Sequence, residues 1–123
     1  RILDRFLAIN SSNDPAYVAA KAFMDSKGVQ SVTDALNNEF AGIVAEKYYK
    51  AVKEAVMKVD DKLLYLGTRL HGTPKYMEGV MRAAGKYCDV ISINYYSRWS
   101  PELTTAIADW ASWADKPWAR RCV

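Results

Sequence analysis

Two short apolar segments of this 123-residue chain are each followed by polar and aromatic side chains that could bind a ligand. The segments span residues 63–70 and 89–96. The candidate binding residues are Arg69, His71, Asn94, Tyr95, Tyr96 and Trp99. Sugars require this combination, because their hydroxyls need fixed polar partners and their C–H faces stack on aromatic rings. The alternative is structural: the tyrosines pack the rim of the fold and His71 is an ordinary loop residue.

The acidic residues of the chain do not supply a matching pair of catalytic groups. Glycoside hydrolysis ordinarily uses two carboxyl groups that flank the scissile bond. The 14 acidic residues fall within predicted helices or at their ends, except Asp89, which precedes a predicted strand. Since none of them follows a strand, we assign no catalytic residue.

Other catalytic and metal-binding motifs are also missing from the sequence. It contains no Gly-x-Ser-x-Gly, Cys-x-x-Cys or His-Glu-x-x-His motif. One histidine and two cysteines do not make a typical zinc site, so we expect neither a metal nor a cofactor. Cys88 adjoins an apolar run, which predicts a buried thiol.

Hydrophobic periodicity and capping residues define the elements that must position these side chains. Asp14 is predicted to cap a helix, Gly28 to end it, Ser31–Asp34 to start the next, and Thr73 to cap a fourth helix that begins at Pro74. In the long third helix, periodicity places Tyr48 in the apolar stripe, and Glu46 and Lys50 are spaced as an ion pair on one face. The predicted helices span residues 2–8, 15–26, 74–87 and 101–115, with a long one that starts within 31–34 and ends at 60–61. The predicted strands span residues 63–70 and 89–96.

This alternation of helices and strands predicts an α/β fold with parallel strands joined by helical crossovers. A complete (β/α)₈ TIM barrel needs about 250 residues, so we expect roughly half of one. A small doubly wound sheet is the alternative, which the absence of a Gly-rich phosphate loop after either strand disfavours.

Composition narrows the range of partners. The 17 basic and 14 acidic residues are dispersed and leave a net charge of +3, which argues against nucleic acid as a partner. No apolar stretch approaches the roughly 20 residues that a bilayer span requires, so no membrane association is expected. The chain lacks a signal peptide and opens at Arg1 within a helical pattern, which indicates an internal or trimmed fragment.

Several stretches together resemble β-agarases and their relatives. These stretches are VAEKYY at residues 44–49, KLLYLGTR at 62–69, KYCDVISINYY at 86–96 and DKPW at 115–118. The resemblance runs from Leu3 to Trp118 and implies a retaining glycoside hydrolase of the (β/α)₈ clan. It makes residues 1–118 the central part of a catalytic barrel and residues 119–123 an off-pattern C-terminal tail.

The resemblance also implies where the catalytic acids lie. The two predicted strands would be the fifth and sixth of the barrel. The acid/base glutamate would lie upstream of Arg1, and the nucleophile would follow a segment like Lys116–Pro117–Trp118, where this chain departs from the pattern. Arg69 and His71 would line the cleft, and Tyr96, or failing it Tyr95, would orient the nucleophile.

The expected function is therefore that of an internal fragment of a polysaccharide-degrading hydrolase that acts on a β-linked galactan such as agarose. We expect the chain to be inactive by itself, its parent enzyme to be secreted or periplasmic, and exposed sheet edges to favour self-association. The alternatives are a non-catalytic carbohydrate-binding domain and a small α/β interaction domain.

Overall fold

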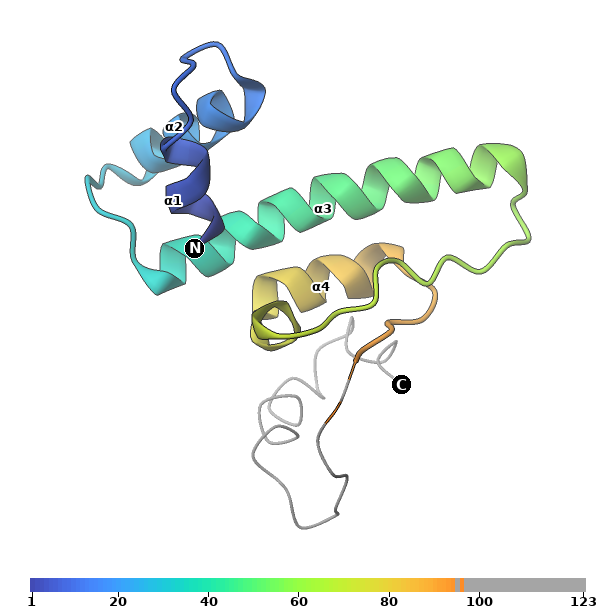
Figure 1. Cartoon of the computed structure of the whole chain (residues 1–123). Coiled ribbons are helices and arrows are strands. Elements are labelled where there is room, and N and C mark those ends of the chain that lie inside the picture. Colours follow the sequence, from blue (N-terminus) through green and yellow to red (C-terminus); the bar gives the residue numbers. More distant parts are fainter. Residues whose placement is uncertain (95, 97–123) are drawn as a thin grey trace.

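The computed structural model describes residues 1–94 and Tyr96, and these residues are mostly helical, with 62% in helices and 3% in strand conformation. The α-helices are α1 (Ile2–Leu7), α2 (Pro15–Lys27), α3 (Asp34–Val59) and α4 (Glu78–Tyr87), and a short 3₁₀ helix, η1, spans Thr73–Tyr76. The long helix α3 runs through the middle of the molecule (Figure 1). Helices α1 and α2 lie at its N-terminal end, and α4 lies alongside it.

The predicted starts and ends of the first helices are largely confirmed. The Asp14 carboxylate accepts a hydrogen bond from the Ala16 backbone N–H at 2.8 Å and caps α2, which ends at Gly28 with a left-handed φ of 65°. The Thr33 hydroxyl accepts one from the Leu36 N–H at 3.2 Å and caps α3. These short-range signals are reliable because a cap needs only residues within one helical turn.

The expected α/β fold is wrong for the described residues. They form no β-sheet and no barrel, because the segments predicted as strands contribute only isolated bridges, one of which joins Leu70 and Ile93 in parallel. The segments do run side by side as extended chain: Leu70 N–H donates to Ser92 C=O at 2.8 Å and Asn94 N–H to Leu70 C=O at 2.7 Å. Gly67, with a φ of 64°, interrupts the regular alternation that a longer ladder requires.

The predicted helix over residues 74–87 is also corrected. The chain makes the 3₁₀ turn η1, passes through Met77 in an extended conformation and only then starts α4 at Glu78. Thr73 therefore lies inside η1 and does not cap α4. Pro74 is compatible with the first turn of either kind of helix, so the sequence did not distinguish them.

Close packing of α3 against α4 forms the larger of two hydrophobic clusters. The helices meet at Gly42 and Gly79, where backbone approaches backbone, and the cluster includes Tyr49, Met81 and Cys88, each at most 2% exposed. The predicted buried thiol of Cys88 is thus confirmed. Tyr49 takes the core position, whereas Tyr48, which the sequence placed in the apolar stripe, is 49% exposed.

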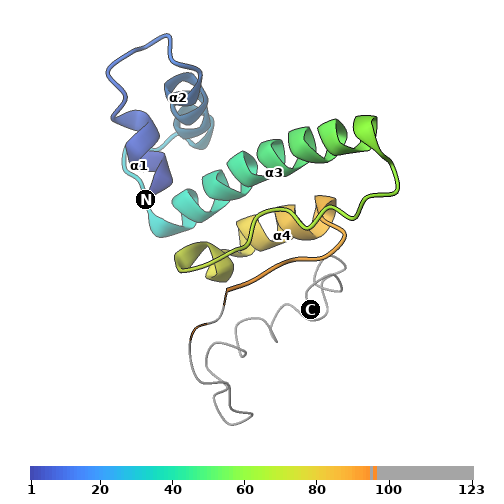
Figure 2. The same cartoon turned by 45° about the vertical axis from the view of Figure 1, so that its right-hand side comes forward.

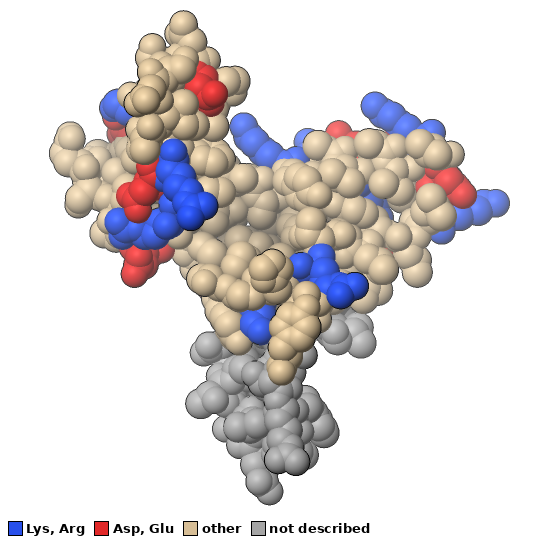
Figure 3. All heavy atoms as spheres, in the orientation of Figure 1, with Lys and Arg blue, Asp and Glu red and all other residues tan. Residues whose placement is uncertain are grey.

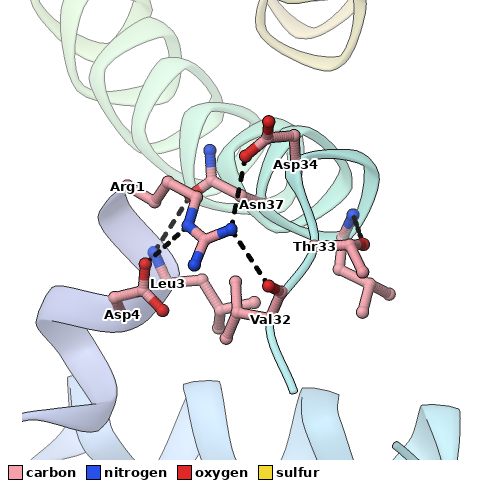
Figure 4. Close-up of polar contacts among 8 residues, drawn as sticks. Arg1, Leu3, Asp4, Val32, Thr33, Asp34 and Asn37 are labelled. Carbon is pink, nitrogen blue, oxygen red and sulfur yellow. Dashed lines mark hydrogen bonds and ion pairs between the residues drawn. The ribbon is translucent and has the colours of Figure 1, made fainter.

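A second cluster joins α1 and α2 to the first turns of α3 around Leu3, Phe23 and Phe40. Figure 4 shows how its polar rim holds α1 in place. The Arg1 guanidinium donates to the Asp4 carboxylate at 2.6 Å, to Val32 C=O at 3.0 Å and to the Asp34 carboxylate at 3.3 Å. The buried Asn37 side chain accepts a hydrogen bond from Leu3 N–H at 3.2 Å.

Charged side chains mark the surface of these helices, and Figure 3 shows Lys and Arg mixed with Asp and Glu on the visible face. The predicted pair of Glu46 with Lys50 is replaced by two others. Glu46 accepts from Lys86 on α4 at 2.5 Å, and Lys50 lies 3.9 Å from Glu54. No described helix combines the length and apolarity needed to cross a bilayer.

Candidate functional site

Two of the predicted binding residues, Asn94 and Tyr96, lie together at the end of the second extended segment. The Asn94 side-chain amide donates a hydrogen bond to the Tyr96 hydroxyl at 2.9 Å, and the Tyr96 ring is 87% exposed. An exposed ring beside an amide has the polar and stacking groups that a sugar ring uses. The structure therefore brings together one amide and one aromatic side chain of the expected set.

Lys75 is a residue of this region that the sequence analysis missed. It is only 9% exposed, and its ammonium donates to the Asn94 C=O at 3.3 Å. The same ammonium lies 5.0 Å from the centre of the Tyr76 ring. Burial of a lysine head group in a turn is unusual and marks Lys75 as a support for the segment that carries Asn94. A lysine directly after Thr-Pro gave no sequence signal for this role.

Among the described residues, the other predicted binding residues have no contact with the pair of Asn94 and Tyr96. Arg69 and His71 flank the buried Leu70 and are both exposed. Successive side chains of an extended segment point to opposite sides. Arg69 and His71 are two residues apart, so both side chains point away from the side that Leu70 faces. Tyr95 and Trp99, together with the predicted helix at 101–115 and the tail at 119–123, lie outside the described residues.

An open groove lies between α1, α3 and the segment that leads into α4. Its volume is about 1100 Å³. Apolar side chains of α3, with Val80 of α4, contribute to its lining, and Arg1, Arg5 and Asp34 line it as well. Figure 2 shows the chain after Val59 passing back along α4 toward this side of the molecule.

Several acidic side chains of the described residues are engaged in contacts that hold the fold together. The Asp89 carboxylate accepts hydrogen bonds from Lys53 Nζ at 2.6 Å and from Tyr65 N–H at 2.8 Å. Asp4 and Asp34 both contact the Arg1 guanidinium, and those hydrogen bonds raise the pKa of Arg1. Hydrogen bonds from Lys86 and Tyr87 lower the pKa of Glu46. Within the part of the chain that the structure describes, no three His, Cys, Asp or Glu side chains lie where they could hold a metal ion.

Tyr65 is a titratable group with a strongly raised pKa, and its environment is structural. The ring is 7% exposed, and its hydroxyl, which is buried, has no hydrogen-bond partner. Burial raises the pKa of Tyr65 to about 12. An isolated phenol in an apolar core has no partner for proton transfer, so this shift does not identify a catalytic group.

Replacing this hydroxyl is expected to stabilise the chain. Tyr65→Phe removes a buried polar group that has no partner, which should raise the free energy of unfolding by about 1 kcal/mol at pH 7. The folded pKa lies above the unfolded value near 10, so the wild-type chain keeps the full contribution of this phenol below pH 10 and loses it as the pH rises toward 12. Urea unfolding at pH 7 and pH 11 measures both effects: the advantage of the variant should grow at pH 11. A destabilised Tyr65→Phe chain would show that the hydroxyl is hydrogen-bonded.

The described fold is similar in sequence and structure to part of a glycoside hydrolase. That protein is BpGH50, whose crystal structure matches 98% of this chain at 55% sequence identity, with a TM-score of 0.84. GH50 is a β-agarase family. The chain spans 26% of the length of BpGH50. No family model matches the chain, and no curated protein matches it.

Proposed function

We propose that this chain is part of a polysaccharide-degrading glycoside hydrolase that cleaves a β-linked galactan such as agarose. The observation that carries the proposal is the 55% identity to BpGH50 over 98% of the chain, together with the TM-score of 0.84. Identity at this level over a whole chain accompanies a shared backbone, and here the two backbones agree closely. The activity itself belongs to the whole enzyme, of which this chain would supply about a quarter.

In this proposal the chain contributes a wall of the substrate cleft. Arg69, His71, Asn94 and Tyr96, with Tyr95 and Trp99, hold the polysaccharide by hydrogen bonds and ring stacking. The pairing of Asn94 with the exposed Tyr96 supports this assignment, because it fixes an aromatic face in a defined orientation. Lys75 holds the backbone beneath that pair.

The chain alone is inactive in this proposal, because none of its acidic residues follows either apolar segment and the agarase pattern puts both catalytic carboxylates outside the chain. Asp4, Asp34 and Asp89 are engaged by Arg1 or Lys53, and each is a partner in holding the fold.

A chimeric enzyme tests the function directly. In BpGH50 the region that matches this chain is replaced by the corresponding residues of this chain, and release of reducing sugar from agarose is measured. We expect kcat/KM within about tenfold of BpGH50, a difference of about 1.4 kcal/mol in transition-state stabilisation. Tyr96→Ala in the chimera should raise KM more than it lowers kcat, whereas Lys58→Ala, at the exposed end of α3, should change neither.

Two outcomes would contradict the proposal. A chimera that melts cooperatively like BpGH50 but releases no sugar would show that this chain cannot serve as part of such an enzyme. Reducing sugar released by the isolated 123-residue chain at an enzyme-like rate would show that its own acids are catalytic.

A further inference from the structure

We infer that the Tyr76 ring is a second sugar-stacking residue, next to the pair of Asn94 and Tyr96, and that Lys75 holds the two in a fixed relation. The ligand is a polysaccharide long enough to place one sugar ring on Tyr76 and another on Tyr96. That the ligand is a galactan rests on the proposed function, whereas the contacts that join these residues are features of this chain.

Tyr76 is placed for this role because the helix predicted over residues 74–87 divides in two. Tyr76 is the last residue of η1, and Met77 is extended before α4 begins at Glu78. The Tyr76 side chain therefore belongs to a separate turn, and its residue is 39% exposed. A tyrosine ring exposed to this extent offers apolar surface on which the C–H face of a sugar stacks.

The Lys75 ammonium contacts both parts of the site. It lies over the Tyr76 ring, 5.0 Å from the ring centre, and donates a hydrogen bond to the Asn94 C=O at 3.3 Å. The Asn94 side-chain amide in turn donates to the Tyr96 hydroxyl at 2.9 Å. The two exposed rings, 20 positions apart in the sequence, are thus connected through two intervening side chains.

Burial of Lys75 makes this connection specific. The residue is 9% exposed, and burial of an ammonium is unfavourable unless polar partners replace its water. The Asn94 C=O and the electron-rich face of Tyr76 both contribute to that compensation, so the ammonium favours the arrangement that keeps them close. Stacking residues held in one arrangement bind a polysaccharide with a smaller loss of conformational entropy than two independent side chains.

An NMR titration of the 123-residue chain with two oligosaccharides of agarose tests the inference. The disaccharide covers one ring, and the hexasaccharide is long enough to reach both. We expect the hexasaccharide to bind at least about tenfold more tightly, because its second contact forms at a high effective concentration. The C–H protons of the stacked sugars should shift upfield, since they lie over aromatic faces.

Variants at two positions identify the second stacking residue. Tyr76→Ala should remove the advantage of the hexasaccharide and leave the affinity for the disaccharide within about twofold of wild type, because Tyr96 still binds one sugar. Tyr76→Phe keeps the ring and should keep the advantage. Lys75→Met keeps a long apolar stem without the charge and should reduce the advantage, because the two rings are no longer held together.

Leu64→Ala is the matched control. Leu64 is 72% exposed and adjoins Tyr65, whose C=O accepts from Asp89 N–H, so it lies at the end of the extended segments opposite Asn94. Its removal should change neither affinity. The inference is overturned if the folded wild-type chain shows no preference for the hexasaccharide, if Tyr76→Ala weakens both oligosaccharides by the same factor, or if Tyr76→Phe loses the preference as well.

The two proposals fail in different ways. A chain that binds the hexasaccharide through Tyr76, beside a folded but inactive chimera, would leave this site assigned and refute the hydrolase function. An active chimera, beside a chain in which Tyr76→Ala does not change the preference for the hexasaccharide, would do the reverse.

Discussion

Gly42→Ala should destabilise the chain by about 2–3 kcal/mol, although alanine is the better helix former by about 1 kcal/mol. A Cβ atom at position 42 would lie 2.9 Å from the Gly79 Cα and 3.0 Å from the Gly79 carbonyl oxygen. Both are backbone atoms of α4, so no side chain can rotate away and the two helices must separate. Because α3 and α4 enclose the larger cluster, that separation loosens most of its contacts.

Chemical denaturation of Gly42→Ala and of Ala51→Val measures this effect. The second variant enlarges a side chain on the exposed side of the same helix and should change the free energy of unfolding by less than about 0.5 kcal/mol. Gly79→Ala should resemble Gly42→Ala, because its Cβ would lie 2.7 Å from the Asn38 C=O. A Gly42→Ala chain as stable as wild type would mean that the helices are not in backbone contact.

Gly67→Ala should cost about 3 kcal/mol, from two separate causes. The left-handed φ of 64° disfavours any side chain, at about 1–2 kcal/mol. In addition, the new Cβ would lie 2.5 Å from Cys88 Sγ and 3.0 Å from a ring carbon of Tyr49, both in the buried cluster. Overpacking of a filled core adds about 1–3 kcal/mol.

A double-mutant cycle separates these two causes. Cys88→Ala removes the sulfur atom, so Gly67→Ala should cost less in that background, and the difference reports the clash. Gly28→Ala is the matched control, because it has nearly the same φ of 65° with no atom within 4 Å of the added Cβ. If Gly28→Ala and Gly67→Ala are equally destabilising, the contact with Cys88 has no energetic importance.

Local signals predicted the helical part of the fold, and non-local partners decided the rest. Asp14 and Gly28 act within one turn, so their roles could be inferred from the neighbouring residues. The apolar runs at 63–70 and 89–96 were predicted as parallel strands, which is wrong: in the described residues only Leu70 pairs with residues 92–94, and a sheet needs further strands. Periodicity also failed to separate Tyr48 from Tyr49, since only the approach of α4 decides which ring is covered.

The residues of the candidate site, like the elements of the fold, could be predicted from the sequence only in part. The polar residues after each apolar run were identifiable by type, and Asn94 and Tyr96 do lie together. The role of Lys75 depends on a contact across 19 residues, between its ammonium and the Asn94 C=O, and no pattern in the sequence encodes that distance. The helix and the binding role predicted for residues beyond position 96 stay predictions.

The side chain of Ile2 contacts both hydrophobic clusters, and α3 contributes residues to each. Loss of packing around Phe23 or Phe40 in one cluster therefore affects Tyr49 and Met81 in the other through α3 and Ile2. The two clusters are therefore coupled in their unfolding through the contacts of Ile2 and α3. Unfolding of α1 and α2 as a separate, earlier step requires that these contacts be lost first.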